Sequence, residues 1–291
     1  MNNHQQKWMY LIVLSLIWGS SFILMKKALV GLTPIQLGAF RVIITAIFLF
    51  FIGFKKLKQI KRDQWKWVLI SALLGTFFPS FLYAYAISGI DSSIASILNS
   101  ITPFNALWVG AIFFGIVFKR SQIVGILIGL LGTVILILKG ADLNPHQNYW
   151  YALLPIASSL GYAFNVNIIK KYLQDLEALA ITTGNFVLIV IPALLVLIFS
   201  GFFTSFELTE KTELSLVYIF ILAIVGTGLA KIMFNKLIQI SSPIFSTSVT
   251  YLIPIVAVIW GVVDGEKLSL IQLFAALVIL FGVYLVNKQN S

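Results

Sequence analysis

The sequence predicts an all-α, polytopic membrane protein whose ten transmembrane helices form two inverted five-helix repeats. Of 291 residues, 59% are hydrophobic and 10% are charged, and the mean hydropathy is +0.99. A soluble domain averages about 45–50% apolar and about 25% charged residues. The apolar residues also come in runs of about 20, the length that crosses a bilayer as a helix. A soluble enzyme, a disordered chain and a disulfide scaffold are therefore excluded, the last because the chain has no cysteine.

Ten apolar segments between charged loops supply the expected helices. Each is expected to be helical, because a backbone surrounded by lipid must satisfy its own hydrogen bonds. Trp8, Trp65 and Trp150 stand at segment ends, where aromatic belts form. The expected spans are 8–25, 34–54, 67–88, 93–118, 122–138, 149–169, 178–200, 214–235, 243–263 and 268–286.

Charge predicts the orientation of these spans. If the N-terminus lies in the cytoplasm, the inner loops and termini hold 13 of the 20 Lys and Arg residues, and the outer loops hold five. Segment 55–66 supplies six of the inner residues, and Lys119, Arg120 and Lys288 belong to the same set. Because cytoplasmic loops are enriched in Lys and Arg, we expect an inner (plasma) membrane protein with both termini cytoplasmic. The net charge of +10 then reflects contact with membrane lipid, and no nucleic-acid partner is expected.

The two halves of the chain, 1–145 and 146–291, resemble each other. Five spans are an odd number, so the second copy would enter the membrane upside down relative to the first. Inverted repeats recur in secondary transporters, with the substrate site near the midplane between the halves. Chance similarity between apolar helices is the alternative. Positions 151 residues apart match at Gly75-Thr76 with Gly226-Thr227 and at Pro103 with Pro254, and positions 144 apart match at Trp18 with Tyr162 and at Lys26-Lys27 with Lys170-Lys171.

Several of these motifs, taken in order, resemble the EamA-type transporters of the drug/metabolite transporter superfamily. They are the Trp-Gly-Ser-Ser-Phe run at 18–22, Arg41, the proline-bearing fourth and ninth spans, and Gly265-Glu266-Lys267. The resemblance implies a ten-helix carrier of small metabolites, often an exporter. This family often has an acidic residue after both the fourth and the ninth helix. Here Glu266 follows the ninth, but the first half reads Phe118-Lys119-Arg120, so a role for that first acidic residue does not transfer.

No set of residues for catalysis or metal binding lies inside the expected spans. All ten acidic residues fall in expected loops, His146 is in a loop and His4 is near the terminus. Proton-coupled carriers commonly use buried carboxylates or histidines, so proton coupling would need Lys231, a boundary acid such as Glu266, or a protonated substrate. A membrane enzyme would need a Ser–His pair, paired carboxylates or a metal cluster. We therefore expect no enzyme activity, no cofactor and no metal.

Lys231 is the most unusual residue, because a lysine near a helix centre costs about 2.5–3.5 kcal/mol on insertion scales. Thr227, Lys231, Asn235 and Gln239 follow each other at intervals of four, which places them on one helical face. Two interpretations stay open. This face lines a cavity that attracts a carboxylate or phosphate, or Lys231 snorkels to the cytoplasmic end on its long side chain.

Three residues are expected to have structural or gating roles. Arg41 lies within the second span, where it either pairs with helix-end carbonyls or a polar neighbour, or contributes to gating or substrate binding. Pro103 and Pro254 each follow a run of hydroxyl and amide residues. A proline frees a carbonyl one turn earlier, which those side chains can satisfy, and the kinked helices can also line a cavity.

Polar and aromatic residues complete a predicted substrate cavity. Rings can stack on an amphipathic metabolite while amides fix its orientation, and ordinary helix packing is the alternative. The expected cavity residues are Trp18, Ser21, Tyr83, Asn99, Tyr162, Asn165, Thr227, Lys231, Asn235 and Thr250.

These residues predict a secondary transporter that works by alternating access on a small-molecule substrate, such as an amino acid or a related amphipathic compound. Export is favoured only by the family resemblance. A sugar-phosphate exchanger or a flippase for a lipid-linked substrate is the alternative, and a membrane-embedded enzyme is less favoured. Gly125, Gly129 and Gly132 predict close helix packing, or a homodimer surface.

Overall fold

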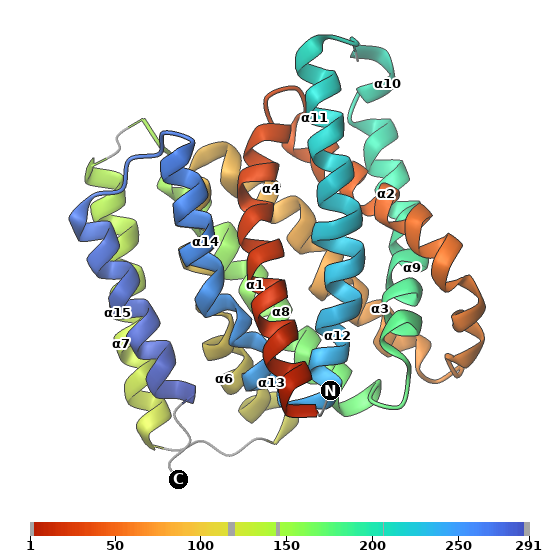
Figure 1. Cartoon of the computed structure of the whole chain (residues 1–291), viewed down its shortest axis with the longest axis horizontal. Helices are drawn as coiled ribbons and strands as arrows, with labels where there is room; N and C mark the ends of the chain where they lie inside the picture. Colours follow the sequence, from red (N-terminus) through yellow and green to blue (C-terminus); the bar gives the residue numbers. More distant parts are fainter. Residues whose placement is uncertain (1–2, 116–119, 144–145, 206, 288–291) are drawn as a thin grey trace.

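The computed structural model describes residues 3–115, 120–143, 146–205 and 207–287, and within these ranges it contains helices and no strand (Figure 1). Eight helical segments of the described chain are long and apolar enough to cross a membrane. Two shorter apolar stretches, Leu127–Lys139 and Leu270–Gly282, lie within further helices. The predicted all-α class is confirmed. The first helix begins and the last helix ends at the same end of the bundle (Figure 1).

The helices follow one another along the chain with short connections. The first part of the chain contains α1 (Asn3–Ala28), α2 (Pro34–Gly53), η1 (Phe54–Gln59), α3 (Trp65–Ala72), η2 (Leu73–Phe77), α4 (Phe78–Gly89), α5 (Ser92–Asn99), α6 (Thr102–Phe114) and α7 (Arg120–Leu143). The second part contains η3 (Tyr149–Ala152), α8 (Leu153–Tyr172), α9 (Ala178–Phe199), α10 (Phe202–Ser205), α11 (Glu210–Ile221), η4 (Leu222–Leu229), α12 (Ala230–Ile240), α13 (Pro243–Thr247), α14 (Val249–Val263) and α15 (Leu270–Asn287).

Most helices follow the expected spans, but the expectation that every acidic residue lies in a loop is wrong. α11 begins at Glu210 rather than at 214, so Glu210 and Glu213 lie in its first turn. Carboxylates are favourable there because a helix N-terminus carries partial positive charge. α7 likewise extends to Leu143 and so includes Asp142.

The third and eighth expected spans each contain a π-helical segment. η2 joins α3 to α4, and η4 joins α11 to α12. Each contains one of the two matching Gly-Thr pairs, Gly75-Thr76 in η2 and Gly226-Thr227 in η4. Because π segments are frequent at functional sites, both mark a region of the bundle where a site is expected.

Helices from the two parts of the chain are interleaved. α1 packs on α14, and α8 packs on α6 and α4. α2 packs on α9, and α7 packs on α15 at the left of Figure 1. A Cβ atom on Gly19 of α1 would lie 2.5 Å from the Cβ of Val256 on α14. A larger residue at Gly19 would therefore push these two helices apart.

The glycine face of α7 is covered by α15. A Cβ on Gly132 would lie 2.9 Å from the backbone N of Ile279, and a Cβ on Gly282 would lie 2.7 Å from the backbone O of Gly125. The prediction that these glycines allow close helix packing is confirmed. Because α15 occupies this face, a homodimer would have to use another surface, and a homodimer stays a prediction.

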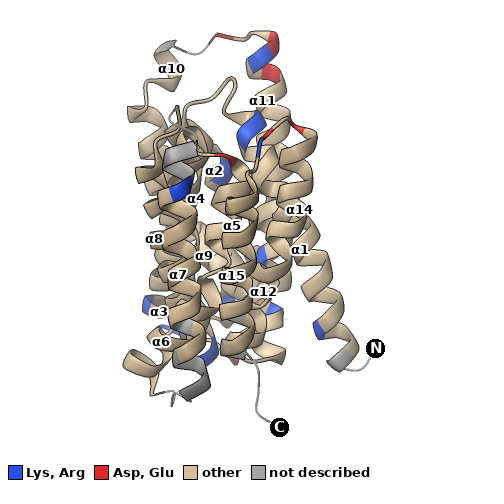
Figure 2. Cartoon of the chain, turned by 90° about the vertical axis from the view of Figure 1, so that its left-hand side faces the viewer, with Lys and Arg blue, Asp and Glu red and all other residues tan. Residues whose placement is uncertain are grey.

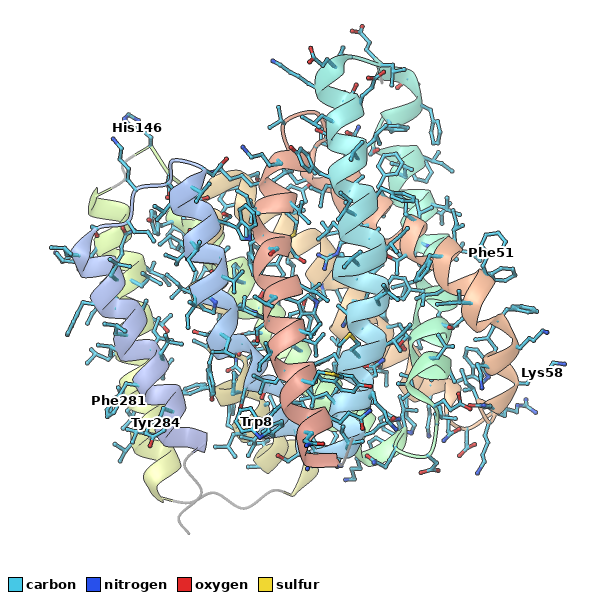
Figure 3. The ribbon with its side chains drawn as sticks, viewed as in Figure 1. Trp8, Phe51, Lys58, His146, Phe281 and Tyr284 are labelled. Carbon is cyan, nitrogen blue, oxygen red and sulfur yellow. The ribbon has the colours of Figure 1, made fainter. Side chains whose placement is uncertain are left out.

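The outer surface follows the layers of a bilayer. Apolar side chains such as Phe51, which is 82% exposed, and Phe281 point outward on the flanks of the bundle (Figure 3). Charged residues gather towards its two ends (Figure 2). A surface this apolar requires contact with lipid, so the chain is a multi-pass membrane protein. Phe118, Lys119 and Lys288, which entered the sequence predictions, lie outside the described residues.

Candidate functional site

A cavity lies inside the bundle, and its lining residues come from α1, α2, α4, α5, α6, α8, α12, α13, α14 and the π segment η4. Its free volume is about 60 Å³, which is room for a few water molecules. A metabolite would therefore bind only when the surrounding helices move apart. Eight of the ten predicted cavity residues line it, namely Trp18, Ser21, Tyr83, Asn99, Tyr162, Thr227, Lys231 and Thr250.

Arg41 also reaches this cavity, from α2, and is 9% exposed. Its Nε donates to the Oγ1 of Thr227 at 2.8 Å, and one terminal nitrogen contacts the Sδ of Met25 at 3.6 Å. Thr227 in turn donates to the backbone O of Leu222 at 3.0 Å, within η4. A thioether is a weak acceptor, whereas a guanidinium carries five N–H donors. Arg41 therefore bridges α2 to η4 and keeps donor capacity on the cavity side.

Lys231 on α12 is 8% exposed and points into the bundle. Its Nζ donates to the backbone O of Gly75 in η2 and lies 5.3 Å from the centre of the Tyr162 ring on α8. The interpretation that Lys231 snorkels to the end of its helix is therefore wrong. Both partners are neutral: a carbonyl dipole and an aromatic face stabilise the ammonium without balancing its charge.

The remaining cavity wall combines aromatic rings with paired polar groups. The Tyr83 hydroxyl donates to the Oδ1 of Asn99 at 2.7 Å, and the Tyr83 ring lies nearly parallel to that of Tyr162, with centroids 6.2 Å apart. The indole N–H of Trp18 donates to the backbone O of Gly226 at 3.0 Å. These bonds fix the orientation of the rings around the cavity.

Asn165 and Asn235 do not line the cavity, so the prediction needs correction at these two positions. The Oδ1 of Asn165 accepts a bond of 2.6 Å from the Oγ of Ser71, between α8 and α3. The Nδ2 of Asn235 donates to the Oγ1 of Thr182 at 2.9 Å, between α12 and α9. A buried amide needs partners, and for both residues a neighbouring helix supplies them.

The two prolines stand in different local structures. Pro103 lies in the first turn of α6, directly after the helix is interrupted between α5 and α6. Pro254 lies inside the continuous helix α14, and the break in this span comes earlier, at Ser248. Hydroxyl groups bond to preceding carbonyls, as Thr250 does to Thr247 at 2.8 Å. The carbonyl that Pro254 frees one turn earlier is that of Thr250 itself, which this bond does not reach. The structural and gating roles of both prolines therefore stay predictions.

A second group of charged residues lies where α1 ends, α5 begins and α14 ends, and in it Glu266 is buried while the lysines and Asp264 are partly exposed. We call it the Glu266 cluster; it contains Lys26, Lys27, Ser92, Ser93, Asp264 and Glu266. The Oε1 of Glu266 accepts from the Nζ of Lys26 at 2.9 Å and from the Oγ of Ser92 at 2.6 Å, and its Oε2 accepts from the Oγ of Ser93 at 2.5 Å. The backbone N–H groups of both serines donate to the same carboxylate at 3.1 Å. Asp264 pairs with both lysines. The carboxylate of Glu266 therefore caps the N-terminus of α5, where negative charge is favoured.

The hydrogen bonds in this cluster keep its carboxylates ionised. Burial raises the pKa of Glu266, but bonds from the two serines and Lys26 outweigh burial and hold its pKa below the usual value. The pKa of Asp264 is lowered in the same way, because its bonds to both lysines outweigh its burial. Asp91 differs: burial raises its pKa, and its bond from Gln147 does not compensate. Two carboxylates therefore balance two lysines in the cluster.

Some functional candidates carry no obvious signal in the sequence. Ser92 and Glu266 stand 174 positions apart, and nothing in the sequence indicates that they meet. Phe22 and Met25 could have been found, because they lie four and seven positions after Trp18 and share its helical face. The lining residues beyond the predicted ones, apart from Arg41, are Phe22, Met25, Thr102, Gly226, Phe234, Thr247 and Ile253.

Comparison with known proteins gives matches along most of the chain. A model of the EamA-like transporter family matches twice, over residues 6–138 and 149–288. The uncharacterized inner membrane transporter YedA of Escherichia coli (strain K12) is 28% identical over 283 residues, which cover 95% of this chain and 89% of that protein. The uncharacterized transporter YvbV of Bacillus subtilis (strain 168) is 22% identical over 294 residues, which cover 97% of this chain and 91% of that protein.

A relative with a named substrate and a solved structure also match. The S-adenosylmethionine/S-adenosylhomocysteine transporter of Chlamydia trachomatis serovar D is 24% identical over 283 residues, which cover 94% of this chain and 86% of that protein. One crystal structure superposes with a TM-score of 0.67 at 17% identity, covering 96% of this chain and 95% of that chain. The two chains therefore share a fold.

Proposed function

The chain belongs to the EamA-like transporter family, and on that premise we propose that it exports a small amphipathic metabolite, such as an amino acid or a related compound, by alternating access. The membrane is the inner membrane, with both termini cytoplasmic. The observation that carries this proposal is the cavity. Helices from both parts of the chain wall it, and aromatic rings, hydroxyls and two cations line it.

The architecture in this proposal has ten spans in two inverted repeats, 1–145 and 146–291. A two-fold relation requires reciprocal packing. α1 packs on α14, and α8, which matches α1 in sequence, packs on α6, which matches α14. The matched pairs α2 with α9 and α7 with α15 pack on each other. The two family matches and the two π segments support the same relation.

Alternating access needs two closures that open in turn. At one end, the Glu266 cluster joins α1, α5 and α14. At the other end, the Nζ of Lys170 on α8 donates to the backbone O of Ser241 at 2.7 Å and to that of Gln239 at 3.2 Å, at the C-terminal end of α12. In the proposed cycle, outward opening breaks the first set of bonds and inward opening breaks the second.

Transport is tested with the full chain in proteoliposomes. Labelled amino acids and related metabolites are screened with and without a pH gradient, beside protein-free vesicles. We expect uptake of at least one compound above the protein-free control, and loss of that uptake in Lys231→Ala. Failure of every compound in both conditions would contradict the transport proposal.

Orientation is tested by cysteine labelling, because the native chain has no cysteine. Lys58 and Lys211 are both exposed, and the proposed topology places them on opposite sides of the membrane. A membrane-impermeant maleimide added to intact cells should label Lys211→Cys, and should label Lys58→Cys only after lysis. The reverse pattern would place both termini outside.

A further inference from the structure

The charge inside the cavity is unbalanced. Arg41 and Lys231 are both more than nine-tenths buried, and no residue in the described lining is acidic. None of the salt bridges in the described part of the chain includes either residue. A buried cation without a counter-ion is unfavourable in a membrane. A site with two such cations favours a ligand that supplies the missing negative charge.

The partners of these two cations leave room for such a ligand. The Nε of Arg41 donates to a hydroxyl, and one terminal nitrogen contacts the sulfur of Met25. No carboxylate of the described chain accepts from its guanidinium. Lys231 has three N–H donors and bonds to one carbonyl, that of Gly75. Charge-assisted bonds to an oxyanion are about twice as strong as bonds between neutral groups. An anion entering the cavity would therefore displace weak contacts and form strong ones.

The cavity offers an ammonium group few free oxygen acceptors. Its amide oxygen, the Oδ1 of Asn99, already accepts from Tyr83 and from the hydroxyl of Thr102 at 3.2 Å. The carbonyl of Gly75 is taken by Lys231. A positive group would also be repelled by both fixed cations. The carboxylate of an amino acid would therefore strengthen binding in this cavity, and its ammonium group would weaken binding.

The aromatic rings around these cations indicate the chemical character of the uncharged part of the ligand, its body. Trp18 and Phe234 meet edge to face with centroids 4.9 Å apart, and Phe22 and Tyr83 meet in the same way at 5.6 Å. Such rings pack well against a flat apolar or aromatic body. They provide few free polar groups for the several hydroxyls of a sugar.

Resting on the proposed transport function, we infer that the cavity takes an organic anion, a carboxylate or phosphate monoester with an aromatic or apolar body and no ammonium group, with its oxygens between Arg41 and Lys231. This narrows the substrate class from amphipathic metabolites in general. It also predicts that removing the amino group from an aromatic amino acid strengthens binding.

Binding of a matched series to the purified full chain tests this inference by titration calorimetry. The probes are 3-phenylpropanoate, 2-phenylethyl phosphate, L-phenylalanine and 2-phenylethylamine, which share one body and differ in charge. We expect at least one of the two anions to bind about tenfold more tightly than L-phenylalanine and about a hundredfold more tightly than the amine. The tighter anion shows whether the site suits carboxylates or phosphates, and either order supports the inference.

Variants show whether the cavity cations are responsible. Lys231→Met should weaken binding of the tighter anion about tenfold, whereas Lys236→Met, the same change on the same helix outside the lining, should leave it unchanged. Arg41→Lys keeps the positive charge but loses the planar guanidinium that can donate two parallel hydrogen bonds. It is expected to weaken binding less than Arg41→Gln. The inference is overturned if L-phenylalanine or the amine binds as tightly as both anions, or if Lys231→Met binds like the native chain. Absence of anion binding up to about 10 mM overturns it as well.

The two proposals fail separately. Vesicles that move the amine or L-phenylalanine, but bind neither anion, would keep the transport function and remove the anion inference. Tight anion binding by a chain that moves no compound across vesicles would keep the anion site and remove transport.

Discussion

Two groups of charged residues in this molecule differ in the balance between positive and negative charge. In the Glu266 cluster, two lysines face two carboxylates, and both oxygens of Glu266 accept hydrogen bonds. In the cavity, Arg41 and Lys231 face hydroxyl, carbonyl, sulfur and ring partners. The first group is complete, and the second lacks its negative charge.

This difference in charge balance indicates the role of each group. A complete cluster holds helices together, because each charge has a partner in the folded chain and loses it when helices separate. An incomplete group destabilises the empty protein, since burial removes hydration without supplying a counter-ion. Proteins keep such unfavourable groups where function needs them. The comparison therefore supports a stabilising role for the end of the bundle and the proposed binding role for its interior.

The largest effect is expected when the complete cluster is broken. Glu266→Ala leaves two serine hydroxyls and the N-terminus of α5 without their acceptor and leaves Lys26 with Asp264 alone, and should lower stability by about 3 kcal/mol. Thermal unfolding in detergent measures this loss. Asp63→Ala removes an exposed carboxylate and is the matched control. Equal unfolding temperatures for the two variants would show that the cluster does not hold the helices.

The next effect concerns the membrane potential. If the cavity cations stay in place and the substrate is a monoanion, each transport event moves one negative charge across the membrane. A membrane potential of 100 mV then contributes about 2.3 kcal/mol, which corresponds to a substrate concentration ratio of about 50-fold. An inside-negative potential would then drive export without any intramembrane proton relay. Solid-supported membrane recordings should show a current on adding 3-phenylpropanoate, and a much smaller one in Lys231→Met. Uptake of labelled 3-phenylpropanoate without current would contradict a net movement of charge.

The cavity can be predicted from sequence largely because polar residues are rare in apolar spans. Arg41 and Lys231 cannot face lipid without a large loss of hydration, so they are expected to lie inside the bundle, and they do. The same reasoning fails for Asn235. It shares a helical face with Lys231, but α12 changes neighbours along its length and meets α9 at that turn. A spacing of four gives the face of a helix, and only tertiary packing gives the neighbour.

The Glu266 cluster, in contrast to the cavity, cannot be predicted from the sequence. Its residues stand at helix ends, where charged residues are common and carry no special signal. The contact of Glu266 with Ser92 and Ser93 depends on the crossing of α14 and α5, between residues more than 170 positions apart. Neither hydrophobic periodicity nor charge counting reports such a crossing. The fold class, by contrast, follows directly from composition and run length.

A smaller effect of opposite sign is expected in the cavity. Lys231→Met removes an unbalanced charge and fills similar volume with an apolar side chain, so stability should stay equal or rise by about 1 kcal/mol. The lost bond to Gly75 and the lost contact with Tyr162 limit the gain. Thermal unfolding measured beside Glu266→Ala gives the comparison directly. A loss as large as that of Glu266→Ala would show that Lys231 is a structural residue with satisfactory partners.

The smallest effect is the pH dependence of the complete cluster. The pKa of Glu266 is lower in the folded chain than in the unfolded one, because its hydrogen bonds outweigh its burial. Its contribution to stability is therefore present above the unfolded pKa of about 4.3 and is lost as the pH falls through the folded pKa. Asp264 acts in the same direction, whereas Asp91, with a raised pKa, opposes them.

The unfolding temperature of the native chain should thus fall as the pH is lowered from 6 to 3. In Glu266→Gln the fall should be shallower, because the amide does not titrate, and in Asp91→Asn it should be steeper, because the opposing group is gone. The cavity cations predict no change in this range, since lysine and arginine stay charged there. A Lys231→Met variant should consequently keep the native slope, and a flattened slope would mean that the two groups of charge are coupled rather than separate.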